Sequence, residues 1–285
     1  MEYFIKRTPT LIFVFTTLFL LLTVFLPSKG YNDELLMISS VAAFIFGLVI
    51  VFAITNKNDR LNKVNELLKL ENSYNLRIFK LSKMLDKDMH ENVAKHLDSY
   101  IQDTIDYPLE DFSQSNKSFD KLYSYVMGTM HVKGIKEDIL YEEMVRTLNE
   151  SLSNRIQIST LTSDRLSKYE WISISGLTTV IIFILYRMSD PNILSSLELT
   201  ILAGSSFLLV LILRDINNLK WQKQEWTWDP LFDLFVSMGM IPYFPKGVVK
   251  TGEYKIPHGA TVRVGHHVID DSGKPKRVIE MINNP

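Results

Sequence analysis

Four stretches of this chain contain almost no charged residues, and they constrain its fold more than any other feature. They cover residues 10–26, 35–54, 171–187 and 197–213. A helix needs about 20 apolar residues to cross the hydrocarbon of a bilayer, with a range of about 17–25. The regularly spaced polar positions of a helix on a soluble domain are missing from all four stretches. We therefore predict four transmembrane helices rather than the buried helices of a soluble protein.

The first stretch has a second interpretation as a secretory signal peptide, because Lys6 and Arg7 precede it. However, the following residues PSKG make a poor cleavage site. The apolar run also exceeds the usual signal core of about 7–15 residues. We expect the chain to keep this stretch as its first helix.

Basic residues flank the four stretches unevenly. Most lie near a terminus or in the flanks of the long middle section: Lys6, Arg7, Lys57, Arg60, Lys63, Arg165, Lys168, Arg214, Lys220 and Lys223. The two short connections carry only Lys29 and Arg187, which three nearby acidic residues offset. By the positive-inside rule, this asymmetry predicts a multi-pass protein of the inner (plasma) membrane with both termini and the middle section in the cytoplasm.

These boundaries divide the chain into five parts. A transmembrane hairpin occupies residues 1–56, and a cytoplasmic helical insertion follows at 57–168. A second hairpin covers 169–216, a juxtamembrane amphipathic segment 217–245, and a small β-rich cytoplasmic tail 246–285. The predicted fold class is mainly α, with four transmembrane helices, a long helical insertion between the second and third, and a small C-terminal β unit.

Composition excludes several classes of function. The 285 residues carry a net charge of −1 and include no cysteine. The first observation argues against a nucleic-acid partner, and the second excludes disulfides, thiolate metal sites and a cysteine nucleophile. The motifs of phosphate-binding loops, zinc proteases and serine hydrolases are missing. We expect no enzymatic activity and no cofactor.

Two charged residues, Arg187 and Glu198, lie at the predicted outer ends of the third and fourth helices. They are candidates for an ion pair that attracts ions to an outer mouth. The simpler alternative is a pair of charges that reach the interface along their aliphatic stems. No charge occupies the middle of a predicted span, so a proton-relay pump is not expected.

Small residues within the predicted spans indicate close contacts between helices. The helix-packing candidates are Ala43, Gly47, Gly176 and Gly204. Small side chains let helix backbones approach one another in a bilayer. The same residues could line a narrow pore, but packing is the commoner role.

Helical periodicity continues from Asn58 through the middle section, so the second span is expected to extend into the cytoplasm as one long helix. Glu71 and Asn72 interrupt its apolar stripe. A break follows at DKDMHE, where Asp88 and Glu91 have the spacing of a capping box.

Three more helices are predicted in the insertion. The first of them ends before Tyr107 and Pro108, because proline cannot continue a helix. The next covers residues 119–131. The last covers 136–168 and leads into the third span, with an apolar face of Leu140, Met144, Leu148, Leu152, Ile156 and Leu161.

Tryptophans cluster around the predicted inner boundary of the membrane. Trp171 begins the third span, and Trp221, Trp226 and Trp228 follow the fourth. Indole prefers the membrane interface, which makes all four interface candidates. The alternative, that the last three pack wholly against protein, is equally open.

The C-terminal tail has the pattern of short strands separated by glycine-containing turns. The expected strands are VVK, EYKI, TVRVG, HHVID and KRVIEMI, and the last two are predicted to form a hairpin. Adjacent His266 and His267 would point to opposite faces of a strand, so no metal site is expected.

The order of these parts resembles the bacterial bestrophin-like domain family of four-span membrane proteins, over about residues 10–215. The residues that carry the resemblance are Arg60 after the second span, the stretch HLDSYIQDTIDYP with Asp106, Tyr107 and Pro108, and Arg155 with Trp171 before the third span. The chain departs from the family pattern in lacking a proline just before Trp171 and in its exit RDINNL from the fourth span.

The resemblance implies subunits that surround an axial pore, as in the pentameric anion channels called bestrophins. Phe44, Leu48 and Phe52 recur every four residues on the second span and are the pore-lining candidates. A stripe of this kind more commonly faces lipid or another helix. The leading hypothesis is a homo-oligomeric channel for small anions in the lipid bilayer. The alternative is a non-conducting membrane-anchored scaffold or sensor whose cytoplasmic helices and tail bind a protein partner.

Overall fold

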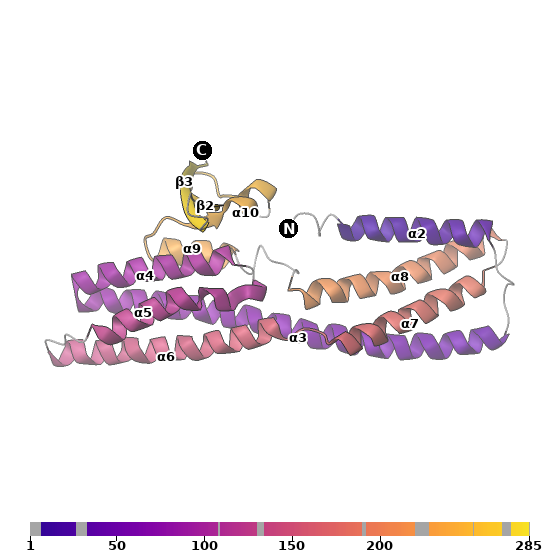
Figure 1. Ribbon diagram of the computed structural model, residues 1–285, viewed down its shortest axis with the longest axis horizontal. Helices are drawn as coiled ribbons and strands as arrows, with labels where there is room; N and C mark the ends of the chain where they lie inside the picture. Colours follow the sequence, from indigo (N-terminus) through magenta and orange to yellow (C-terminus); the bar gives the residue numbers. More distant parts are fainter. Residues whose placement is uncertain are drawn as a thin grey trace. The chain divides into compact units, whose positions relative to one another are not determined.

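The computed structural model describes residues 7–26, 33–107, 109–129, 134–189, 192–219, 228–252, 254–269 and 275–284. The protein is mainly helical and ends in a small three-stranded sheet, as the sequence predicts (Figure 1). It divides into two compact units. Unit 1 comprises Met1–Leu61 and Arg165–Trp221, and unit 2 comprises Asn62–Asp164 and Gln222–Pro285.

Unit 1 contains the four apolar helices. These are α2 (Arg7–Phe25), the first part of α3 (Asp33–Leu85), α7 (Lys168–Arg187) and α8 (Ile193–Asn217). Phe46 and Ile50 of α3 are buried in one cluster with Ile174 and Ile181 of α7 and Leu213 of α8. A second cluster joins α2 to α8 through Phe19, Leu199 and Ala203. These two clusters of unit 1 are therefore made of apolar side chains, while Lys57, Arg60 and Asn217 are buried elsewhere in the unit.

The outer surface of unit 1 is apolar as well. Among the described residues, three segments are long and apolar enough to cross a membrane: Asp33–Leu85, Ile135–Arg187 and Ile193–Asn217. The second of these contains α6 and α7, and its long run without charged residues lies in α7. The apolar stretch Pro9–Phe25 of α2 is shorter.

Nine hydroxyl groups of the apolar helices bond to their own backbones, whereas the buried hydroxyl of Ser196 has no partner among the described residues. In each case a serine or threonine donates to a carbonyl three or four residues earlier. The donors are Thr16, Thr23, Ser39, Ser40, Thr178, Thr179, Thr200, Ser205 and Ser206. These polar groups are therefore satisfied without water.

Unit 2 is a bundle made from the rest of α3 together with α4 (Lys87–Asp106), α5 (Asn116–Gly128) and α6 (Ile135–Ser163). A short 3-10 helix, η1 (Leu109–Ser115), connects α4 to α5. The expected continuation of the second span as one long helix is confirmed, because α3 is unbroken over 53 residues.

Three local predictions in the insertion are wrong. Asp88 and Glu91 do not form the capping box; α4 begins after Asp86, whose side chain makes no capping hydrogen bond. The helix predicted at 136–168 does not run into the third span, because α6 ends at Ser163 and α7 starts at Lys168. The helix predicted at about 119–131 is α5, which begins and ends three residues earlier than predicted.

A capping box does form at the start of α7. The hydroxyl of Ser167 accepts from the backbone N–H of Glu170 at 3.2 Å, and the Glu170 carboxylate accepts from the backbone N–H of Ser167 at 2.7 Å. This reciprocal pair satisfies the free amides of a new helix start, which explains why the helix restarts here.

The tail contains α9 (Asp229–Ser237), β1 (Tyr243–Pro245), α10 (Lys246–Thr251), β2 (Thr261–Ile269) and β3 (Pro275–Asn283). The strand order is β1-β2-β3, with β1 parallel and β3 antiparallel to β2. The predicted hairpin is confirmed, although TVRVG and HHVI form a single strand. VVK lies in α10 rather than in a strand, and the described residues of EYKI, 254–256, lie in no strand.

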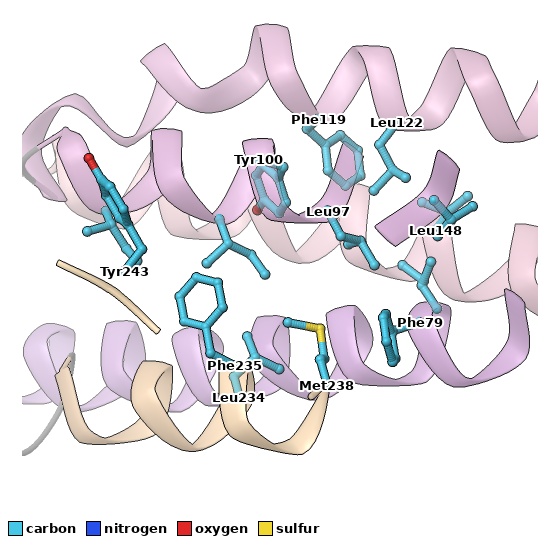
Figure 2. Packing of buried hydrophobic residues seen from close by; sticks show 14 of the residues in the cluster. Phe79, Leu97, Tyr100, Phe119, Leu122, Leu148, Leu234, Phe235, Met238 and Tyr243 are labelled. Carbon is cyan, nitrogen blue, oxygen red and sulfur yellow. The ribbon is translucent and has the colours of Figure 1, made fainter. Parts of the chain in front are cut away.

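The tail and the helical insertion share one hydrophobic core. Phe235 and Tyr243 of the tail are buried in the same cluster as Leu97 and Ile101 of α4. Figure 2 shows Leu234, Phe235 and Met238 pointing into this cluster, below Leu97 and on the same side as Phe79. The tail is therefore an integral part of unit 2, because removing it would expose the apolar face of α4 to water.

The packing of Tyr243 on β2 makes a prediction. A Cβ atom at Gly265 would overlap the ring and hydroxyl of Tyr243. Gly265→Ala should therefore displace Tyr243 and lower the free energy of unfolding by about 1–3 kcal/mol, measured by denaturant unfolding in detergent. Gly247→Ala is the matched control, because nothing lies within 4 Å of a Cβ atom there. Equal stability of the two variants would contradict this packing.

Candidate functional site

A buried cation lies in the centre of the helical bundle of unit 2. The side chain of Arg155 on α6 is 3% exposed, and that of Glu71 on α3 is 4% exposed. Their nearest charged atoms, Arg155 Nη1 and Glu71 Oε1, are 3.8 Å apart. Nη1 also donates to the hydroxyl of Tyr100 on α4. Nη2 donates to Ser115 Oγ at 3.0 Å and to Asn116 Oδ1 at 2.7 Å.

Glu71 receives hydrogen bonds from two helices. The hydroxyl of Tyr100 donates to Oε1 at 2.6 Å, and that of Ser151 donates to the same oxygen at 3.1 Å. Asn154 donates to Oε2 at 2.9 Å and to the carbonyl of Leu67 at 3.0 Å. The carboxylate thus ties α3 to α4 and α6. We call Glu71, Tyr100, Asn154, Arg155 and Ser151 the ionic core.

Aromatic rings enclose the guanidinium of the ionic core. Its Cζ atom lies 4.7 Å from the ring centroid of Tyr100, 4.8 Å from that of Phe112 and 4.7 Å from that of Phe119. The negative faces of aromatic rings attract a cation, and they also keep water away from it. The surroundings of Arg155 therefore favour an ion pair with Glu71 from which water is excluded.

Burial raises the pKa of Glu71, while Arg155 and the hydrogen bonds from Tyr100, Asn154 and Ser151 oppose that change. Burial raises the pKa of Tyr100 well above its ordinary value, and the charge of Glu71 adds to this effect. Tyr100 is therefore a neutral phenol that accepts from Arg155 and donates to Glu71. An ion pair with both charges engaged holds helices in register, because breaking it leaves a buried charge without a partner.

A second polar cluster attaches the tail to α4. Arg263 of β2 forms a bidentate pair with Asp98, with Nη1–Oδ2 and Nη2–Oδ1 distances of 2.8 and 2.5 Å. Arg277 of β3 pairs with Asp103 and, through Nε, with Asp106 Oδ2 at 2.8 Å. Hydrogen bonding and charge from Asp103 and Asp106 raise the pKa of Arg277 against the opposing effect of burial.

Tyr243 completes this cluster, because its hydroxyl donates to Asp106 Oδ1 at 2.7 Å. Burial, and then the bond to Asp106, raises the pKa of Tyr243. Three acidic residues of α4, Asp98, Asp103 and Asp106, are therefore already occupied by the tail of the same chain.

The pore-lining candidates lie on the exposed face of α3. Phe44 is 67% exposed, Leu48 45% and Phe52 65%. Residues two apart in a helix are separated by about 200°, so this stripe points away from the buried Phe46 and Ile50. Within one chain, the described residues leave these three side chains largely uncovered.

The small residues divide into two groups. Gly204 is buried, and a Cβ atom there would lie 2.7 Å from Thr16 Cγ2 of α2, so Gly204 permits close packing of α2 on α8. Ala43 and Gly176 are exposed, and Cβ atoms at Gly47 and Gly176 would meet nothing within 4 Å. In a single chain, only Gly204 of the four predicted packing residues contacts another described helix closely.

Arg187 and Glu198 form no ion pair in the part of the chain that the structure describes, and Glu198 is exposed. The expected pairing at an outer mouth is therefore not brought about by the fold of one chain.

The tryptophans also differ from one another. Trp171 packs at the edge of the unit 1 cluster that contains Ile174. Trp228 is 7% exposed in the core of unit 2, with its ring in an edge contact with Phe244, so the protein-packing interpretation describes it. Trp221 and Trp226 lie outside the described residues.

Several residues that carried the family resemblance hold polar contacts. Arg155 and Asp106 belong to the two clusters above. Arg60 Nη1 donates to the carbonyl of Asn217 at 3.1 Å, and Asn217 Oδ1 accepts from the backbone N–H of Leu166 at 2.9 Å. This contact joins α3 to the end of α8 and the start of α7 within unit 1.

No family model, no curated protein and no solved structure matches this chain. The family resemblance remains a proposal supported by its residues alone. The described residues also contain no group of three His, Asp or Glu side chains able to hold a metal ion. His267 instead lies beside Asp106, with Nε2 and Oδ2 3.6 Å apart.

Neither Glu71 nor Tyr100 is predicted from the sequence to be a partner of Arg155. A signal was present, because Glu71 interrupts the apolar stripe of α3 at a position that faces the core. A charged residue at such a position is rarely buried unless another buried group neutralises it.

The ionic core predicts unequal effects of removing its two charges. Glu71→Gln leaves a guanidinium that cannot lose its proton, and we expect a loss of about 3–5 kcal/mol in the free energy of unfolding. Arg155→Met should cost less, because Glu71 can be protonated. The stability of this variant should fall as the pH rises through the range in which Glu71 ionises, because burial makes the pKa of Glu71 in the folded state higher than that in the unfolded state.

The double variant Glu71→Gln, Arg155→Met should be more stable than the sum of the single losses predicts, because it leaves no unpaired charge. Denaturant unfolding of all four proteins in one detergent gives the comparison. Additive losses would contradict coupling between the two residues.

Proposed function

We propose that this chain is a four-span inner-membrane protein of the bestrophin-like type, with its termini and the helical insertion in the cytoplasm. The support for the membrane lies in the outer surface of unit 1. Phe13, Phe44 and Phe183 are each at least 60% exposed, on α2, α3 and α7. Water would oppose such a surface, and hydrocarbon would accept it.

The internal bonds of the serine and threonine hydroxyls support the same conclusion. In hydrocarbon, each polar group must find a partner within the protein. The hydroxyls of Thr16, Thr178 and Thr200 do so within their own helices. Apolar surfaces and internally satisfied hydroxyls together favour a lipid environment.

We further propose that copies of the chain assemble around α3 and conduct small anions. The observation that carries this proposal is the exposed stripe of Phe44, Leu48 and Phe52, opposite the buried face of the same helix. The exposed Ala43 and the half-buried Gly47 flank the stripe and would let the α3 helices of neighbouring copies approach one another.

The alternative function is a non-conducting scaffold or sensor. It is favoured by the size of unit 2, whose bundle and tail share one core. A bare pore needs no such domain. The two functions differ in whether ions cross the membrane, so one measurement distinguishes them.

The proposed topology predicts where single cysteines can be labelled. The chain has no cysteine, so the protein without the substitution should not react with the maleimide and serves as the control. Asp120→Cys, at an exposed site on α5, should react with a membrane-impermeant maleimide only after cells are permeabilised. Labelling of Asp120→Cys in intact cells would contradict the cytoplasmic placement.

The channel hypothesis predicts halide flux through liposomes that contain the purified protein. Flux should exceed that of empty liposomes, and Phe44→Ala combined with Phe52→Ala should change its rate because both side chains would line the pore. Phe13→Ala is the matched control, because Phe13 is as exposed as these residues but lies on α2. Absence of flux across a range of pH and calcium concentrations would count against conduction and favour the scaffold.

Assembly can be tested with the same preparations. Images of particles in detergent should show a symmetric ring with a central hole. Gly47→Leu should break the ring without unfolding the chain, because nothing of the same chain lies within 4 Å of a Cβ atom there. Gly204→Leu should instead separate α2 from α8. Intact rings formed by Gly47→Leu would argue against an interface at α3.

A further inference from the structure

A shallow groove of about 710 Å³ runs along the solvent side of α6 in unit 2. Its floor is apolar, made by Met127 at the end of α5 and by Tyr141 and Val145 of α6. The hydroxyl of Tyr141 already donates to the carbonyl of Val126 at 2.8 Å. The ring of Tyr141 therefore lines the groove, and its hydroxyl already has a hydrogen-bond partner.

The rim of the groove is acidic. Asp138, Glu142 and Glu150 are exposed and line it. None of the three takes part in an ion pair with another residue that the structure describes. The cation at the rim is Arg146, whose Nη2 lies 2.5 Å from Glu143 Oε2. The charge that the groove presents to a ligand is therefore negative.

The acidic residues follow the helical repeat. Positions 138, 142 and 150 lie on one ridge of α6, and twelve residues of helix span about 18 Å. A ligand that meets all three must extend along the groove. The same ridge also carries Arg146, between Glu142 and Glu150. The three carboxylates outnumber this cation, so the charge of the groove favours a basic ligand.

We propose that this groove binds an amphipathic, basic helical segment of a partner protein. Large apolar residues of the segment would cover Met127, Tyr141 and Val145, while lysines or arginines about eight residues apart would meet Glu142 and Glu150. Helices commonly bind in grooves through an apolar face at this spacing. The proposal is independent of conduction, because a channel and a scaffold could both carry such a surface.

The test uses a model peptide of repeated leucine and lysine in a helical pattern. The full-length protein is placed in phosphatidylcholine nanodiscs, and peptide binding is followed by fluorescence anisotropy against empty nanodiscs. We expect binding that weakens at high salt, because salt screens exposed charges. Glu142→Lys combined with Glu150→Lys should weaken binding at least tenfold, and a peptide with glutamate in place of lysine should not bind.

The matched control is Glu91→Lys, an exposed acidic residue on α4 of the same unit. It changes the net charge without touching the groove and should leave affinity within about twofold. Met127→Glu should weaken binding, because it places a charge in the apolar floor of the groove. Circular dichroism should show that each variant is folded. Equal binding by the charge-reversed variant, binding of the acidic peptide, or a change in particle size in Glu142→Lys, Glu150→Lys would each overturn the proposal.

Discussion

The guanidinium of Arg155 has almost no access to water, and the architecture of unit 2 follows from the need to neutralise it. Glu71 supplies the opposite charge, Tyr100 bridges the two, and three aromatic rings exclude solvent. These partners come from α3, α4, η1, α5 and α6, so one buried charge fixes how the helical segments meet. Hydrophobic burial alone would allow these helices to slide past one another, whereas a directional ion pair permits a single register.

Unit 1 is organised by the opposite principle. Its helices hold together through apolar clusters and close packing at Gly204, and nine of its hydroxyls bond to their own backbones. Among the described residues, one directional contact between its helices joins Arg60 of α3 to Asn217 at the end of α8. An environment without water makes such an arrangement stable, which is why the surface of this unit and its interior have similar composition.

Much of the fold could be predicted from the sequence, because apolar periodicity and the absence of charge are local properties. The long helix α3, the end of α4 at Tyr107 and the C-terminal hairpin all follow from such signals. The cap at Asp88 was wrong because spacing alone does not decide which of several acidic residues begins a helix. Leu152 and Ile156 fit the apolar repeat of α6 yet are exposed, since the buried face carries Ser151, Asn154 and Arg155. Partners such as Glu71 and Tyr100 are separated by tens of residues, and only the fold brings them together.

The shared core of unit 2 also has a consequence for biosynthesis. The apolar face of α4 and α6 is covered by tail residues that follow the second hairpin in the chain. After α6 has been made, roughly 65 residues must follow before Trp228 appears, which takes about 3–13 s at ordinary translation rates. During that interval Leu97 and Ile101 lack their final neighbours. Nascent chains of this protein should therefore depend on chaperones until translation ends, and truncated products should be recognised as unfinished and degraded.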